Sequence, residues 1–155
     1  MKTAFFAGSF NPFTIGHADI VGRGLGLFDR VVIGVGINPA KQTAEDVAER
    51  VGEIARLYDD EPRISVVSYS CLTTDAALGA GATVLLRSVR DVTDFEYERN
   101  LADVNRRISG LDTVFLTALP ELACVSSSLV RELRRFGRSG EEFLPHKDLR
   151  GTSPK

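Results

Sequence analysis

The sequence predicts a single α/β domain in which a five-stranded parallel sheet carries helices on both faces. Five short apolar runs alternate with stretches whose apolar residues recur at helical spacing, a pattern typical of parallel strands joined by right-handed crossovers. A chain of 155 residues is long enough to bury about 70% of its unfolded surface in one core. Its content of 43% hydrophobic and 26% charged residues is ordinary for a globular protein.

The net charge and the cysteines narrow the class of protein. A formal net charge of −2 provides no basic footprint for nucleic-acid binding, so any anion site must be local. Cys71 and Cys124 are the only cysteines, and neither belongs to a C-x-x-C spacing. We therefore expect two reduced, largely buried thiols and no disulfide or metal framework.

The ends of the chain and its apolar runs predict where the protein resides. No apolar run approaches the length that crosses a membrane, and the N-terminus enters a strand directly instead of a secretory leader. We expect a cytoplasmic protein without membrane attachment, with one domain over residues 1–155. Its polar tail, 147–155, is expected to fray.

The first strand and the loop after it predict an anion site. Thr3 to Ala7 is an apolar run typical of a buried strand, and Ala7 to His17 reads A-G-S-F-N-P-F-T-I-G-H. A helix is expected from about Gly16 to Phe28. Strand, glycine-containing turn and helix N-terminus together direct backbone N–H groups at a phosphate. A histidine at a helix start is more often a cap or a packed ring than a catalyst, so the role of His17 depends on its neighbours.

The second strand leads to a candidate lysine. Val31 to Val35 is a continuous, β-branched run, as expected of a strand covered on both faces. The loop after it carries Lys41 at the same carboxyl edge of the sheet as the first loop. A helix follows from Asp46, its expected N-cap, to Leu57.

Two arginines follow the fourth strand. Ile64 to Val67 is expected to form the third strand, Leu72 to Leu78 a short helix, and Thr83 to Leu86 the fourth strand. Arg87 and Arg90 come directly after it. The guanidinium fork matches phosphate oxygens, which favours a phosphate ligand over two merely solvated charges.

A capping box of the S/T-x-x-E type, Thr93 to Glu96, predicts the start of the next helix. Glu98 and Asn105, seven residues apart, share one face of this helix. A neighbouring apolar stripe is formed by Tyr97, Leu101, Val104 and Ile108.

The last strand and helix complete the predicted domain. Asp112 to Leu116 is expected to form the fifth strand, and Val125 to Glu132 opens a helix that stops before Gly137. Its three serines, Ser126 to Ser128, exceed what one N-cap needs, and with Arg131 nearby they suit phosphate oxygens. The apolar side of this helix is expected to comprise Leu129, Val130, Leu133 and Phe136.

The topology rule for such sheets predicts where these side chains meet. Ligands of parallel α/β sheets bind outside the carboxyl ends of the strands, where strand order reverses. Six side chains from separate segments should therefore converge on one crevice, namely Ser9, His17, Lys41, Arg87, Arg90 and Ser127.

Four segments together resemble the phosphopantetheine adenylyltransferase family. They are S-F-N-P-F-T-I-G-H at 9–17, N-P-A-K at 38–41, R-S-V-R-D-V-T-D-F-E-Y-E at 87–98 and V-S-S-S-L-V-R-E at 125–132. The resemblance extends over about residues 3–145. It implies a Rossmann-like homohexamer that transfers AMP from ATP to 4′-phosphopantetheine, giving dephospho-coenzyme A and pyrophosphate in the penultimate step of coenzyme A synthesis.

The resemblance also implies roles for individual residues. Since a phosphate monoester is already a nucleophile, catalysis needs positioning and charge stabilisation rather than a Ser–His or Cys–His pair. The implied catalytic residues are Ser9, His17 and Lys41. The implied phosphopantetheine site comprises Ser9, Lys41, Leu72, Thr73, Arg87 and Asn105. The implied ATP site comprises Gly8, Ser9, Phe10, His17, Arg90, Glu98, Val125, Ser126, Ser127 and Ser128.

Further ligands and some departures follow from the same resemblance. Mg²⁺ would arrive bound to ATP, since the sequence shows no dedicated carboxylate cage. Coenzyme A is an expected feedback ligand because it shares the pantetheine arm. Thr14 stands where most nucleotidyltransferases carry the first histidine of H-x-G-H. The chain also departs from the common family pattern at Gln42, Ser88, Leu122 and Cys124, which leaves the details of the adenine and phosphate pockets open.

Two alternative functions remain open on the sequence. Another nucleotidyltransferase, such as a nicotinate-mononucleotide adenylyltransferase or a cytidylyltransferase, generally needs histidine at the position of Thr14 and lacks D-F-E-Y-E. A non-catalytic nucleotide or coenzyme A sensor could keep the same fold. Retention of Ser9, His17, Lys41 and Arg90 together favours an enzyme over a sensor.

Overall fold

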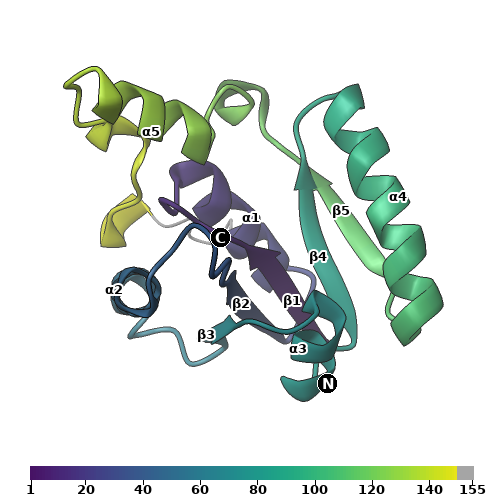
Figure 1. Ribbon diagram of the computed structural model, residues 1–155. Helices are drawn as coiled ribbons and strands as arrows, with labels where there is room; N and C mark the ends of the chain where they lie inside the picture. The colour runs from purple at the N-terminus through teal and green to yellow at the C-terminus, as the bar shows by residue number, and fades with distance from the viewer. Residues whose placement is uncertain (150–155) are drawn as a thin grey trace.

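A computed structural model describes residues 1–149 and shows a twisted parallel sheet between two layers of helices (Figure 1). The five strands lie in the order β3-β2-β1-β4-β5, which confirms the predicted fold class. The strands are β1 (Thr3–Gly8), β2 (Arg30–Gly36), β3 (Ile64–Tyr69), β4 (Val84–Val89) and β5 (Thr113–Thr117). The helices are α1 (Ile15–Leu25), α2 (Ala44–Leu57), α3 (Thr73–Gly79), α4 (Val92–Ser109) and α5 (Ser127–Arg135). Short 3₁₀ turns are η1 (Pro120–Leu122), η2 (Glu141–Phe143) and η3 (Lys147–Leu149).

The central strand β1 shows why helices cover both faces. Side chains of a strand alternate between faces, so Ala4 and Phe6 point to one side and Phe5 and Ala7 to the other. Ala4 and Phe6 pack in a core with α1 and α2, whereas Phe5 and Ala7 pack in a second core with Ala77 of α3. Each of these four side chains is at most 5% exposed, so β1 is buried on both faces.

The strand order reverses next to β1. The chain passes from β1 to β2 and β3 on one side, then returns to place β4 and β5 on the other. The loop after β1 and the loop after β4 therefore diverge to opposite faces, and a crevice opens between the carboxyl ends of these two strands.

Two predicted boundaries were wrong in ways that concern the site. The N-cap of α2 is Thr43, whose hydroxyl accepts from the backbone N–H of Asp46 at 3.1 Å. Asp46 is thus the third residue of the helix, and its carboxylate accepts in return from the Thr43 N–H. Strand β4 extends to Val89, because pairing with β5 continues as far as Val89 and Thr117, so Arg87 lies within the strand instead of after it.

The predicted start of α4 was also wrong. Asp91 is its N-cap and accepts from the backbone N–H of Asp94 at 2.8 Å, so Thr93 is already helical. Aspartate caps a helix at least as well as threonine, and the Asp91 carboxylate reaches the third helical residue directly. The helix therefore begins one residue before Thr93.

Two predicted apolar faces are only partly covered. On α4, Tyr97, Val104 and Ile108 are 67%, 55% and 57% exposed, so most of the stripe faces outward. At the end of α5, Phe136 is 76% exposed, while Val130 is fully buried. Gly137 adopts a φ of 84°, the left-handed conformation that ends the helix as predicted.

The prediction of buried cysteines was wrong. Cys71 lies in the loop before α3 and Cys124 in the loop before α5, and both thiols are exposed and unpaired by a disulfide. Loop positions lie on the surface because buried loops would leave backbone groups without partners.

The described part of the predicted tail forms η3. Lys147 begins this turn and forms an ion pair with Asp59 at 2.5 Å. Residues 150–155 lie outside the described part of the chain. Within residues 1–149, no helix is long and apolar enough to cross a membrane.

Candidate functional site

A cavity of about 300 Å³ lies at the carboxyl ends of β1 and β4. Its wall is the loop after β1, which turns sharply at Phe10 with a φ of 47°. The Phe10 ring folds back over Gly8, where a Cβ would come within 2.9 Å of that ring, so any larger residue at this position would displace the ring. The cavity is lined by many of the predicted residues, namely Gly8, Ser9, Phe10, His17, Arg87, Arg90, Glu98, Val125, Ser126, Ser127 and Ser128.

His17 is oriented by reciprocal hydrogen bonds with Thr14, the N-cap of α1. The Thr14 hydroxyl accepts from the backbone N–H of His17 at 3.4 Å, and Nδ1 of His17 accepts from the backbone N–H of Thr14 at 3.0 Å. A backbone N–H can only donate, so Nδ1 carries no proton and the neutral imidazole holds its proton on Nε2. His17 is therefore both a helix-start residue and a side chain with one remaining N–H donor.

The surroundings of His17 keep its ring uncharged. The rings of Phe10 and Phe13 lie 4.9 and 5.4 Å from the imidazole, centroid to centroid. Burial among these rings, followed by the positive charges of Arg87 and Arg90, lowers the pKa of His17 to about 3. At neutral pH His17 can donate a hydrogen bond to a phosphate oxygen but carries no positive charge.

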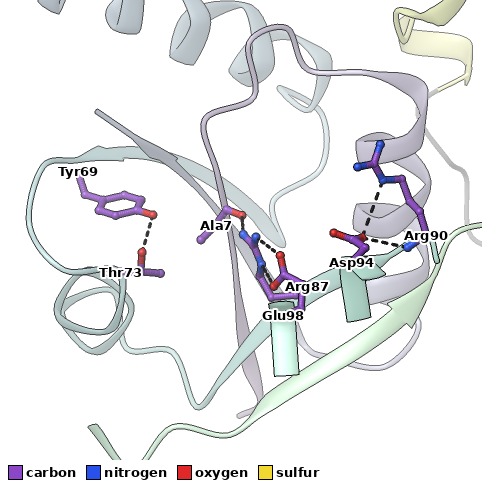
Figure 2. A network of polar contacts seen from close by, with 7 residues as sticks. All are labelled: Ala7, Tyr69, Thr73, Arg87, Arg90, Asp94 and Glu98. Atoms are coloured by element: carbon purple, nitrogen blue, oxygen red, sulfur yellow. Dashed lines mark hydrogen bonds and ion pairs between the residues drawn. The ribbon is translucent and has the colours of Figure 1, made fainter. Parts of the chain in front are cut away.

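Arg87 is held on β4 by two partners (Figure 2). Its Nε and Nη2 donate to the two carboxylate oxygens of Glu98 at 2.8 and 2.6 Å, and its Nη1 donates to the carbonyl of Ala7. Burial lowers the pKa of Arg87, but the hydrogen bonds and charge of Glu98 outweigh it and hold that pKa above its usual value. The guanidinium is thus a fixed positive charge at the end of the sheet.

Arg90 approaches the same cavity from the start of α4. Its backbone N–H donates to Asp94 at 3.1 Å, and its Nε lies 3.9 Å from the same carboxylate (Figure 2). The side chain remains 41% exposed, so its guanidinium is held more loosely than that of Arg87. An exposed cation beside a buried, fixed one suits a ligand with several phosphates.

The three serines before and within α5 each have a different partner. Ser126 caps the helix by accepting from the backbone N–H of Leu129 at 3.1 Å. The Ser127 hydroxyl donates to the carbonyl of Pro12 at 2.7 Å, which ties α5 to the loop. Ser128 accepts from Nη2 of Arg131 at 3.1 Å. The helix N-terminus therefore faces the cavity while its serines organise the wall.

A second cavity of about 160 Å³ adjoins the first through Arg87 and Glu98, which line both. Predicted residues Leu72, Thr73 and Asn105 line its far part. Its apolar lining consists of alanine, leucine and isoleucine side chains from β1, β4, α4 and the N-cap of α3, and α3 itself contributes two threonines. This lining suits a ligand with an apolar or amide-containing body and a charged end that reaches Arg87.

Lys41 lies apart from these two cavities. It lines a third cavity, of about 600 Å³, between α2, α5 and the outer side of the loop at Asn11 to Phe13. The expectation of one crevice for all six side chains is therefore wrong for Lys41. A turn redirects the loop after β2 toward α2, with the Lys41 N–H donating to Asn38 at 3.0 Å, and strand order alone does not specify that direction.

Arg50 is a buried arginine that the sequence prediction missed. It lies on α2 between Val47 and Ile54, is 9% exposed, and donates from Nη1 to the carbonyl of Ser9 at 3.1 Å. The spacing of the sequence could have revealed this position. Arg50 lies three residues after Val47 and four before Ile54, and this spacing places it on the apolar face of the helix.

The donors at this site suit phosphate chemistry. Among residues 1–149, no three histidine, cysteine or acidic side chains lie together as a metal site. The cavity instead combines two helix N-termini, an imidazole N–H and three arginines. Such donors bind and orient phosphate groups and stabilise the charge that develops in phosphoryl transfer.

Sequence comparisons identify relatives over nearly the full chain. Residues 5–133 match the family model described as cytidylyltransferase-like. A phosphopantetheine adenylyltransferase from Porphyromonas gingivalis is 54% identical over 142 residues, covering 92% of this chain and 93% of that protein. Proteins of the same name from Bacteroides fragilis and Methylococcus capsulatus are 48% and 40% identical, covering 94% and 92% of this chain and 97% and 89% of theirs.

Solved structures share the fold at low sequence identity. A bifunctional NMN adenylyltransferase/ADP ribose pyrophosphatase from Francisella tularensis superposes with a TM-score of 0.69 and 13% identity, covering 95% of this chain and 46% of that one. A lipopolysaccharide core biosynthesis protein from Thermoplasma volcanium gives a TM-score of 0.54 and 14% identity over 77% of this chain and 97% of its own.

Proposed function

The chain belongs to the cytidylyltransferase-like family and, within it, to the phosphopantetheine adenylyltransferases, and on this premise we propose that it transfers AMP from ATP to 4′-phosphopantetheine. The products are dephospho-coenzyme A and pyrophosphate. The observation that carries the proposal is the convergence of His17, Arg87 and Arg90 with the α5 N-terminus on one cavity.

The ATP phosphates are proposed to occupy the larger of the two adjoining cavities. Its donors come from several directions, with His17 at the start of α1, Arg90 before α4 and Ser126 to Ser128 at α5. The Nε2–H of His17 would donate to the α-phosphate, where negative charge develops during in-line displacement. Because its pKa is lowered to about 3, the His17 imidazole is neutral at pH 7, and it contributes a hydrogen bond and not a transferable proton.

The phosphopantetheine arm is proposed to lie in the smaller cavity. Leu72 and Thr73 would contact the arm, Asn105 would bond its amides, and Arg87 would hold the phosphate where the two cavities meet. The phosphate oxygen is then a nucleophile placed next to the ATP site, and no side-chain nucleophile is needed.

Ser9 and Lys41 remain predicted catalytic contacts. Ser9 lies in the wall of the ATP cavity, but Lys41 lines the cavity on the other side of that wall. Contact with the reacting phosphates requires the Lys41 side chain to reach from this cavity into the ATP cavity. Lys41 is exposed, and its long, flexible side chain is suited to such a movement.

Magnesium, the oligomeric state and the location also stay predictions. Mg²⁺ would enter with ATP and neutralise phosphate charge, since the described site offers donors for phosphate and no cage for a metal. The exposed stripe of α4, with Tyr97, Val104 and Ile108, supports assembly of several copies, because exposed apolar patches mark protein contacts. We expect a homohexamer in the cytoplasm, with coenzyme A as a feedback ligand.

A substrate comparison tests this function. The full chain is mixed with MgATP and either 4′-phosphopantetheine or nicotinate mononucleotide, and pyrophosphate release is measured. We expect pyrophosphate release with 4′-phosphopantetheine and none with nicotinate mononucleotide. Release only with nicotinate mononucleotide would support the rival transferase, and ATP binding without release from either would support a sensor.

A further inference from the structure

Arg50 links α2 to the wall of the ATP cavity, although it belongs to none of the segments assigned to the site. We propose that Arg50 is a positioning residue for AMP transfer, which holds the Ser9 carbonyl and thereby fixes Phe10 against His17. The kinetic part of this inference rests on the proposed function, whereas its structural part does not.

The burial of Arg50 indicates that the bond to Ser9 is its principal direct interaction. The side chain is 9% exposed, and within residues 1–149 no carboxylate lies within 4.0 Å of its guanidinium in an ion pair. Asp46 and Glu53 stabilise its charge only from a longer range. Arg50 also lines the cavity of about 600 Å³ beside α2, and among residues 1–149 the Ser9 carbonyl at 3.1 Å is the direct hydrogen-bond acceptor of its guanidinium.

This hydrogen bond sets the direction of a peptide plane. The peptide between Ser9 and Phe10 is trans, so its carbonyl and its N–H point in opposite directions. By pulling the carbonyl toward α2, Arg50 also turns the Phe10 N–H away from α2. The next rotation along the chain is the φ of Phe10, which is 47° and thus in the region that L side chains avoid.

The unusual φ of Phe10 needs restraint from both sides. Arg50 restrains the peptide before it, and the Phe10 ring, 3% exposed, is restrained by packing. Downstream, Arg131 bonds the Asn11 carbonyl at 2.6 Å and Ser127 bonds that of Pro12 at 2.7 Å. Arg50 is therefore the restraint on the upstream side of the turn, where the downstream bonds do not reach.

The position of Phe10 in turn determines the surroundings of His17. The Phe10 ring meets the imidazole edge-to-face, with centroids 4.9 Å apart and planes at 86°. If the loop relaxes, this ring moves, and the imidazole keeps its hydrogen bonds with Thr14 but loses the ring contact that packs its other side in place. A displacement of about 1 Å at a catalytic group can cost about 100-fold in rate.

The test compares three variants of the full chain. Arg50→Met removes the charge and the fork, and Arg50→Lys keeps the charge but loses the fork. Arg56→Met is the matched control, because Arg56 is exposed on the same helix and lines none of the three cavities. For each we measure kcat and KM for ATP, and the imidazole signals by NMR, where His17 and His146 are the only histidines.

We expect Arg50→Met to lower kcat about 10- to 100-fold with KM for ATP changed less than about threefold. The NMR signals of His17 in this variant should lose the shift that the Phe10 ring causes. Arg50→Lys should show a smaller loss of kcat and a smaller change of the His17 signals. Arg56→Met should match the wild type. If Arg50→Met does not fold, Arg50→Lys decides the question by the same two measurements.

Unmoved His17 signals in a folded Arg50 variant would overturn the inference, and so would a loss of thermal stability with unchanged kcat. If the wild type releases no pyrophosphate, the proposed function fails, but the NMR comparison still tests the link from Arg50 to His17. Moved signals would then support the structural link by itself.

Discussion

Glu98 holds Arg87 in a two-point ion pair, with N–O distances of 2.6 and 2.8 Å and only 6% of the glutamate side chain exposed. Arg87 comes from β4 and Glu98 from the second turn of α4, and both side chains line each of the two adjoining cavities. Arg87 is thereby fixed in place before any substrate binds.

Glu98→Gln should destabilise the protein. The change keeps the shape of the side chain but leaves the Arg87 guanidinium without its carboxylate. Removing one partner of a buried ion pair lowers the free energy of unfolding by about 3 kcal/mol at the lower end of the usual range. The lower end applies here because the Arg87 side chain is 28% exposed. We expect a Tm lower by roughly 6–12 °C by circular dichroism. Glu96→Gln, at an exposed site on the same helix, should leave Tm unchanged; equal Tm values for both variants would contradict the prediction.

His17→Ala should lower turnover while keeping most ATP binding. Loss of one donor aimed at developing charge typically costs about 10²- to 10³-fold in kcat. The measurement is steady-state pyrophosphate release together with a direct ATP-binding titration. His146→Ala is the control, since His146 is exposed and lines none of the described cavities. Turnover within twofold of the wild type would remove His17 from the mechanism.

The lowered pKa of His17 predicts a pH dependence of stability. In the unfolded chain His17 takes up a proton near pH 6.5, but in the folded protein only near pH 3. Between these values the unfolded state binds more protons, so stability present above pH 6.5 is lost as pH falls. Titration of His17 lowers the free energy of unfolding by at most about 1.4 kcal/mol for each unit by which the pH falls.

Urea unfolding of the wild type and of His17→Gln measures this contribution, because other titrating groups are common to both proteins. The free energy of unfolding of the wild type should fall more steeply between about pH 6.5 and about pH 4.5 than that of the variant. Parallel curves over this interval would show that His17 titrates normally in the folded state.

Thr14→Val should weaken the start of α1. Thr14 is 1% exposed, and its hydroxyl accepts from the backbone N–H of His17, so valine keeps the shape but removes the cap. Loss of an N-cap costs about 1 kcal/mol, or roughly 2–4 °C in Tm for a chain of this size. Thr14→Ser keeps the hydroxyl and should retain most of this cap, so a larger loss with serine than with valine would contradict the role.

Val104→Glu should disrupt assembly without disturbing the fold. Val104 is 55% exposed on α4, so a charge there meets water in a single chain but would be buried between copies. Light scattering should give the wild type a mass several times 16.9 kDa and the variant a smaller one. Arg99→Ala, also exposed on α4, is the control. A wild-type mass near one chain would contradict the homohexamer.

Local signals in the sequence were sufficient for the fold class. Apolar runs such as Val31 to Val35 report burial on both faces, and all five strands were recovered from such runs. Errors lay at boundaries, as at Asp46 and Thr93, because several neighbouring polar residues can serve as N-cap and only the folded backbone selects one. The motifs of the site were predicted because each is continuous in the chain.

The sequence by itself determined the parallel sheet, the loop from Gly8 to His17 and the family of the protein, since periodicity, turn residues and motifs are local properties. Only the tertiary structure decided that Lys41 lies in a separate cavity, that Glu98 pairs with Arg87, and that Arg50 holds the loop. These relationships join residues far apart in the chain. They depend on loop direction and helix packing, which the spacing of residues does not specify.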